Sequence, residues 1–138
     1  MADVSLAILL DRFVRRMHVA LRDKSPAFDT EGVGPTGGMI LLTMAELGCV
    51  PMQDVTNRFG RDKSQMTRAI QSLERKGLVA RVPSQADRRV VFVRLTPPGE
   101  AFVDTLRAVI SQTIDEILEP ISPEERQYLK NVLSRVKI

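Results

Sequence analysis

Residues 62–95, which read DKSQMTRAIQSLERKGLVARVPSQADRRVVFVRL, decide the fold of this chain. The first part, Asp62 to Lys76, has an apolar stripe with helical spacing, formed by Met66, Ala69, Ile70 and Leu73. This pattern predicts a helix with one buried face and one polar face. Asp62 is placed as its N-cap, with Gln65 three residues later in a capping-box pattern, and Gly77 supplies the C-terminal cap.

Two β-branched segments follow this helix, Val79 to Pro83 and Val90 to Leu95. The residues between them, Ser84 to Arg89, predict a hairpin with a six-residue basic tip. A short helix from Met52 to Phe59 precedes Asp62, with the pair Gly60 and Arg61 between the two helices. Helix, turn, helix and hairpin together predict a winged helix-turn-helix.

Further helices are predicted on both sides of this core. An almost wholly apolar helix is expected to open at Pro35 or Thr36 and to end before Gly48, so it belongs in the interior. The terminal helices have stripes that begin at Leu6, Phe102 and Leu129, and the last stripe continues to Val136. Their starts and ends are marked by Lys24 before Pro26, by Thr96 before Pro97 and Pro98, and by the capping box Ser122-Pro123-Glu124-Glu125.

The fold class is therefore mainly α with a small β-hairpin wing. We predict a single domain over residues 1–138, with a winged core at about 36–95 and dimerisation helices at 1–25 and 97–138. A dimer is expected because three further apolar stripes are more than one small body can cover. The alternative is that the terminal helices wrap within one chain.

Composition narrows the function classes. The longest N-terminal apolar stretch is interrupted by Asp11, Arg12, Arg15 and Arg16, so no membrane span is expected. The start does not resemble a signal peptide, which favours a cytoplasmic location. One cysteine and one histidine leave little for a metal site or for acid–base chemistry, and no nucleophile–base pair or phosphate-binding glycine loop is present. We predict that the chain is not an enzyme and has no cofactor or metal.

Positive charge is concentrated in the middle of the chain. Residues 51–95 contain ten basic and four acidic residues, whereas the whole chain has a net charge of only +3. A localised basic region favours a polyanion such as nucleic acid. The alternative is a solvated charged surface.

The polar face of the helix from Asp62 has side chains suited to double-stranded DNA. Gln can pair with adenine and Arg with guanine in the major groove, and hydroxyl groups reach bases or phosphates. The DNA-binding candidates on this helix are Ser64, Gln65, Thr67, Arg68 and Gln71, with Arg75 expected on a phosphate. Any surface helix can show such residues, so the helix alone does not settle the function.

The hairpin tip adds a second candidate contact. We predict that Arg89 enters the minor groove, that Asp87 orients it, and that Arg88 contacts phosphate. The alternative is a solvated turn with an internal Asp–Arg pair. A dimer carrying two such surfaces would read a pseudo-palindromic operator with half-sites ~34 to 36 Å apart.

These residues resemble the MarR (multiple antibiotic resistance regulator) family. The resemblance is carried by the segments 64–68, 73–79, 87–89 and 95–99, together with Arg81, and it covers almost the whole chain. It implies terminal dimerisation helices, a recognition helix in the major groove and a wing arginine in the minor groove. It also implies a repressor released by a small, often phenolic, ligand or by an oxidant. The competing hypothesis is a winged-helix protein-interaction module that does not bind DNA.

The roles of three kinds of residue, a cysteine, a histidine and four methionines, remain open. Cys49 is interpreted as a buried small hydrophobe, with redox sensing as the alternative. His18 is expected at a dimer surface or in solvent, with a ligand cavity as the alternative. Core packing is the simplest role for four methionines, Met39, Met44, Met52 and Met66, which could instead line an adaptable pocket.

Overall fold

The structure is a computed structural model that describes residues 3–24, 32–60 and 62–137. Its elements form two compact units, one from residues 27–107 and the other from residues 1–26 and 108–137. We call these the winged unit and the terminal unit. The mainly helical fold with a small antiparallel sheet agrees with the predicted fold class. Within the described residues, no helix is both long and apolar enough to span a membrane.

The winged unit has the predicted order of helices, with one additional strand. Its elements are α3 (Gly34–Leu47), β1 (Val50–Pro51), α4 (Met52–Phe59), α5 (Lys63–Arg75), β2 (Val79–Pro83), β3 (Val91–Leu95) and the first half of α6 (Pro97–Ile117). The strands pair antiparallel in the order β1-β3-β2. The strand β1 was missed because two residues that pair with Val93 and Phe92 carry no periodicity of their own.

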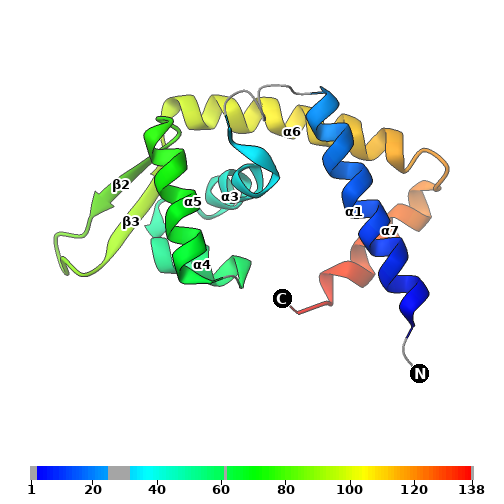
Figure 1. Cartoon of the computed structure of the whole chain (residues 1–138), viewed down its shortest axis with the longest axis horizontal. Coiled ribbons are helices and arrows are strands. Elements are labelled where there is room, and N and C mark those ends of the chain that lie inside the picture. The colour runs from blue at the N-terminus through cyan, green and yellow to red at the C-terminus, as the bar shows by residue number, and fades with distance from the viewer. Residues whose placement is uncertain (1–2, 25–31, 61, 138) are drawn as a thin grey trace. The chain divides into compact units, whose positions relative to one another are not determined.

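The β2–β3 hairpin projects beyond helices α3, α4 and α5 (Figure 1). Its register pairs Val79 with Leu95 and Pro83 with Val91, so β3 begins one residue later than predicted. The amide of Ser84 still donates to the carbonyl of Val90 at 3.2 Å, which closes the loop. The hairpin is thus a wing with its root in the sheet and its tip in solvent.

The core of the winged unit is built by the apolar faces of its helices and sheet. Ile40 and Leu41 of α3, Ile70 of α5 and Val93 of β3 are fully buried. Gly37 is also buried, and a Cβ there would lie 3.0 Å from Val33 and 3.5 Å from Leu73. A side chain at Gly37 would therefore crowd Val33, whereas its distance to Leu73 of α5 would be an ordinary contact.

The terminal unit contains α1 (Val4–Lys24), the second half of α6 and α7 (Pro123–Ser134). Ser122 and Glu125 form the predicted capping box at the start of α7. Ion pairs within this unit join Lys24 to Glu116 at 2.6 Å and Arg126 to Asp115 at 2.8 Å. The prediction that α7 extends to Val136 is wrong, because the helix ends at Ser134.

Candidate nucleic-acid interface

Helix α5 presents the predicted polar face to solvent. Its N-cap is Asp62, whose carboxylate accepts the amide of Ser64 at 3.0 Å. The predicted capping box differs in this detail, since the Asp62 side chain bonds the second helical residue rather than Gln65. Met66, Ile70 and Leu73 are buried on the opposite face, as predicted. Free amides at the first turn also favour an anion at this end of the helix.

The candidate side chains of α5 differ in exposure. Ser64, Gln65, Arg68 and Arg75 are exposed, whereas Thr67 and Gln71 are half-buried. The guanidinium of Arg68 donates from Nε to the carbonyl of Ser64 at 3.3 Å. The exposed set therefore runs along the solvent side of the helix from its first turn to its last.

The end of α5 is closed by a Schellman motif. The amide of Leu78 donates to the carbonyl of Leu73 at 3.1 Å, and the amide of Gly77 donates to Glu74 at 2.9 Å. Gly77 has a φ of 77°, which L side chains rarely adopt. The chain therefore turns directly from α5 into the wing, as predicted for Gly77.

The wing tip pairs Asp87 with Arg89. The Asp87 carboxylate accepts the backbone amide of Arg89 at 3.0 Å and its Nε at 3.2 Å. The backbone bond and, second, the side-chain bond to Arg89 hold the pKa of Asp87 below its ordinary value. The Arg89 side chain is 91% exposed despite this bond, and Arg88 is exposed as well. The tip thus holds an oriented guanidinium that remains accessible.

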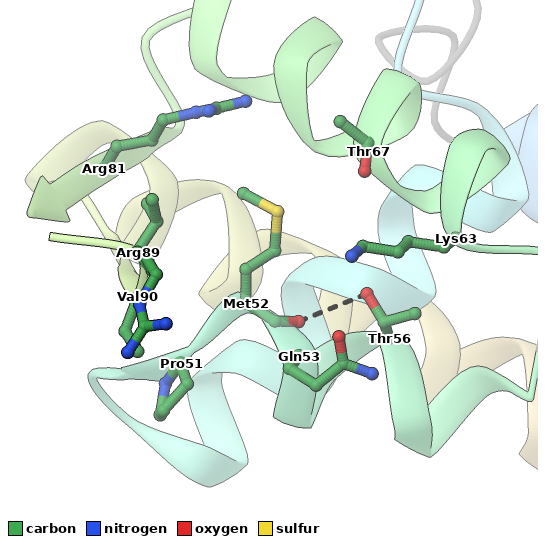
Figure 2. A pocket seen from close by; sticks show the side chains of 10 residues that line it. Pro51, Met52, Gln53, Thr56, Lys63, Thr67, Arg81, Arg89 and Val90 are labelled. Carbon is green, nitrogen blue, oxygen red and sulfur yellow. Dashed lines mark hydrogen bonds between the residues drawn. The ribbon is translucent and has the colours of Figure 1, made fainter. Parts of the chain in front are cut away.

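A pocket of about 220 Å³ lies between α4, α5 and the wing, and sequence reasoning did not find it (Figure 2). Its polar lining comes from Gln53, Thr56, Lys63, Thr67, Arg81 and Arg89, and its apolar lining from Pro51, Met52, Val90 and Val91. The lining contains three cations and no carboxylate. The alternation of side chains along β2 and the position of Lys63 in the first turn of α5 can be seen in the sequence. That these side chains line one pocket depends on how α4, α5 and the wing pack together.

Arg81 links this pocket to helix α5. Its Nε lies 3.2 Å from a carboxylate oxygen of Glu74 on α5. The Nε atom is buried and has no well-aligned hydrogen bond, so the pair is an ion pair rather than a directed bond. The Arg81 side chain therefore joins the root of the wing to the last turns of α5.

Several residues lie elsewhere than expected. Cys49 is exposed, so the interpretation as a buried hydrophobe is wrong. Met39 is also exposed, whereas Met44 and Met66 are buried core residues as predicted. His18 is half-buried on α1. No group of His, Cys, Asp or Glu side chains in the described parts of the chain is arranged to hold a metal ion.

Comparisons with known proteins agree with this geometry. The model of the MarR family matches residues 35–91. The uncharacterized HTH-type transcriptional regulator YdgJ of Bacillus subtilis (strain 168) is 31% identical over 88 residues, which are 64% of this chain and 54% of that protein. The match thus spans about half the length of this relative.

Two solved structures share the fold over almost the whole chain. A mutant MarR from E. coli, complexed with operator DNA, has a TM-score of 0.83 and is 21% identical, covering 98% of this chain and 95% of that one. The Bordetella bronchiseptica protein BpsR, whose DNA binding is described as regulated by 6-hydroxynicotinic acid, has a TM-score of 0.82 and is 24% identical. It covers 95% of this chain and 97% of that one. The winged helix-turn-helix part of this chain, residues 35–91, is thus similar to the MarR family.

Proposed function

We propose that this chain is a sequence-specific regulator of transcription that binds double-stranded DNA with α5 and the wing. The observation that carries the proposal is the pairing of two exposed cationic elements in one compact unit. Helix α5 offers Ser64, Gln65 and Arg68 on its solvent face, and the wing offers Arg89 held by Asp87. A helix of this width fits a major groove, and an arginine on a slender loop suits the adjacent minor groove.

The roles of the nine candidate residues follow from this placement. Ser64, Gln65, Thr67, Arg68 and Gln71 would face base edges or the nearest phosphates, with Arg75 on the backbone. Arg89 would enter the minor groove, while Asp87 keeps its guanidinium oriented and Arg88 contacts phosphate. The function is one of binding rather than catalysis, and its site of action would be the cytoplasm, where the DNA of such a regulator lies.

We expect the DNA-binding form of the protein to be a homodimer. Seven large apolar residues of α1 are exposed within the terminal unit: Val4, Leu6, Ile8, Leu9, Leu10, Val14 and Val19. On α7, Leu133 is exposed as well, and no residue of that helix is buried. Such surfaces are covered in stable proteins, and a two-fold axis lets one chain cover another. A pseudo-palindromic operator follows from that symmetry.

The proposed effector is a small aromatic or phenolic acid. Its binding would release the protein from DNA and so end repression. The pocket beneath the wing supports this class, because Lys63, Thr67 and Arg81 can bind a carboxylate while Met52 and Val91 contact a ring. A ligand there would lie between the two DNA-reading elements. Calorimetric titration with 6-hydroxynicotinic acid tests the site, with Lys63→Met as the variant that keeps the stem and removes the charge.

Selection of bound duplexes from a random pool, followed by salt titration of the selected duplex, tests the main proposal. We expect one recurrent pseudo-palindrome and a loss of affinity of about three orders of magnitude between ~50 and ~200 mM salt, because several counterions are taken up again on release. Failure to bind any duplex at ~50 mM salt would reject DNA binding. The winged helix would then be a protein-interaction module.

A further inference from the structure

The buried part of the wing ends halfway along β2. Side chains alternate between the two faces of a strand, so Val79, Arg81 and Pro83 share one face. Val79 is buried, and Arg81 is paired with Val93 of β3, which is buried as well. Pro83, the next residue on this face, is exposed. Arg81 therefore lies at the border between the core of the winged unit and the free part of the wing.

The wing beyond Arg81 is not anchored by a core of its own. Residues 82–91, all of which the structure describes, are half-buried or exposed. The bond from Ser84 to Val90 and the bonds between Asp87 and Arg89 lie within the wing itself. They determine the shape of the hairpin but not its direction relative to α5. A segment with so few buried contacts moves easily unless a side chain holds it.

The side chain at this border contacts α5. The Nε atom of Arg81 lies 3.2 Å from an Oε atom of Glu74, in the last turn of α5, and Figure 2 shows the arginine extending from the wing toward the helix that carries Thr67. The exposed fraction is 31% for the Arg81 side chain and 36% for that of Glu74, so the pair is less screened than one fully in solvent. Of the ion pairs between described residues, only this one joins α5 to the wing.

Glu74 also compensates one of three neighbouring cations. Lys63, Arg81 and Arg89 line the pocket beneath the wing, and no carboxylate lines it. Like charges that share a small pocket repel one another. Arg81 and Arg89 belong to the wing and Lys63 belongs to α5, so this repulsion acts between the two elements. Loss of the Glu74 carboxylate would remove the ion pair and leave the repulsion uncompensated, and both changes favour movement of the wing away from α5.

We propose that Glu74 is a positioning residue, which acts through Arg81 and holds the wing at a fixed angle to α5. Arg89 and the exposed face of α5 can then bind one duplex at the same time. The inference rests on the proposed DNA binding, and the contacts that carry it lie wholly within the winged unit. A wing that is held before binding adds affinity, because its ordering is not a cost of forming the complex.

A double-mutant cycle tests this role. Fluorescence anisotropy gives the affinity of wild type, Arg89→Ala, Glu74→Gln and the double variant for the selected duplex. In the wild type, Arg89→Ala should weaken binding about 10- to 100-fold, because its groove contact is lost. In the Glu74→Gln background we expect the same change to cost no more than about threefold, because a wing that is not held already loses most of this contact. An undiminished effect of Arg89→Ala overturns the proposal.

Glu46→Gln is the matched control for charge. Glu46 is exposed on α3 and lies 3.8 Å from Arg58 of α4, so this change also removes one acid and one ion pair from the winged unit. Both glutamine variants thus gain the same attraction for the phosphates of DNA. We expect Arg89→Ala to keep its full effect, about 10- to 100-fold, in the Glu46→Gln background. An equal reduction in both backgrounds would assign the result to net charge and overturn the proposal.

A measurement without DNA separates this inference from the proposed function. Spin labels on Gln65→Cys in α5 and Gln85→Cys at the wing tip report the distance between the two elements, with Cys49→Ser removing the exposed native thiol. An excess of unlabelled chain restricts the signal to distances within one chain. We expect Glu74→Gln to broaden the distribution of distances about twofold, because the wing then adopts several angles. Glu46→Gln should leave the distribution unchanged.

The two measurements fail in different ways. A broadened distribution in a protein that binds no duplex rejects DNA binding and supports the positioning role. If Arg89→Ala has no effect in the wild type, the wing assignment is rejected and the label distances decide the role of Glu74. Equal distributions in wild type, Glu74→Gln and Glu46→Gln reject the positioning role and leave the proposed DNA binding intact.

A second pair of variants covers the case in which Glu74→Gln does not fold by circular dichroism. Arg81→Met keeps the stem of the side chain and removes the guanidinium that meets Glu74. Arg94→Met is its control, because Arg94 is exposed on β3 and has the same charge. We expect Arg81→Met to broaden the label distances and Arg94→Met to leave them as in the wild type. Identical distributions in these two variants overturn the proposal.

Discussion

The winged unit and the terminal unit solve the problem of burying apolar surface in different ways. In the winged unit, helices α3, α4 and α5 and the sheet enclose a core with fully buried residues such as Ile40, Val55, Ile70 and Val93. In the terminal unit, α1 has one buried residue, Leu21, and α7 has none. Both units are rich in apolar residues, yet the terminal unit leaves many of its large apolar side chains exposed.

This difference indicates that the two units have different roles. A unit with a closed core keeps the candidate DNA-reading side chains in a defined arrangement, because their supporting residues are packed. A unit with exposed leucines and valines gains stability only when another surface covers it. The proposed dimer is thus a consequence of the terminal unit, and the proposed reading surface a consequence of the winged unit. Three matched comparisons test this difference, and a titration within the wing sharpens the last of them.

The largest effect is expected for Leu10→Glu compared with Met39→Glu. Leu10 on α1 and Met39 on α3 are both 48% exposed, so the two changes differ mainly in the unit they affect. Loss of a buried leucine costs about 1.5 to 3 kcal/mol for each protomer. Leu10→Glu should therefore raise the dimer dissociation constant at least 100-fold in analytical ultracentrifugation. An equal effect of Met39→Glu would show that the dimer does not form through the terminal unit.

Core packing is the next contrast, with Ile70→Ala compared with Ile8→Ala. Ile70 is fully buried in the winged unit, whereas Ile8 is exposed on α1. Ile70→Ala should lower the free energy of unfolding by about 2 to 5 kcal/mol in urea titrations. Ile8→Ala should change it by less than about 0.5 kcal/mol at concentrations where the chain is monomeric. Similar losses in both variants would mean that α1 is covered within one chain.

Two arginines that each pair with an aspartate test the reading surface. Arg89 pairs with Asp87 on the wing, and Arg15 pairs with Asp11 on α1 at 2.7 Å. Arg89→Ala should weaken binding to the selected duplex about 10- to 100-fold and reduce the salt slope by about 1. Arg15→Ala should leave the affinity within about twofold. Fluorescence anisotropy with labelled duplex measures both, and equal affinities of the two variants would argue against the wing assignment.

The smallest expected effect concerns the titration of Asp87. Its pKa is lowered first by the backbone amide of Arg89 and second by the Arg89 side chain. The interaction contributes at pH values above the ordinary pKa of an aspartate and is lost as the pH falls through the lowered pKa. Carboxyl NMR titration should therefore give a pKa below the ordinary one in the wild type. Arg89→Ala should restore only part of the difference, because the backbone amide remains. Complete restoration would assign the whole shift to the guanidinium.

Local signals predicted much of the fold. The bounds of α4 and α5 agree with prediction to within one residue, because caps, glycines and apolar periodicity act over a few neighbouring residues. The Asp87–Arg89 pair was also predicted, since both residues lie in one short loop. The strand β1 was not predicted, because its two residues become a strand only by pairing with β3.

The candidate site was predicted less completely than the helices. The exposed side chains of α5 follow from its buried stripe, so the solvent face could be read from periodicity. Lys63 and Arg81 were missed as neighbours because they belong to different elements that meet only after packing. Cys49 was interpreted as buried from its apolar neighbours Gly48 and Val50, yet it is exposed, because neighbours in sequence do not determine which side of a turn faces the core.

Sequence alone determined which segments become helices, where the cationic wing lies, and which side chains are available for the proposed binding of DNA, since these properties depend on short-range spacing and residue chemistry. Tertiary structure alone decided the third strand, the pocket beneath the wing and the ion pair between Arg81 and Glu74. Each of these joins residues from separate elements, and such contacts exist only after the core has closed around α3 and α5.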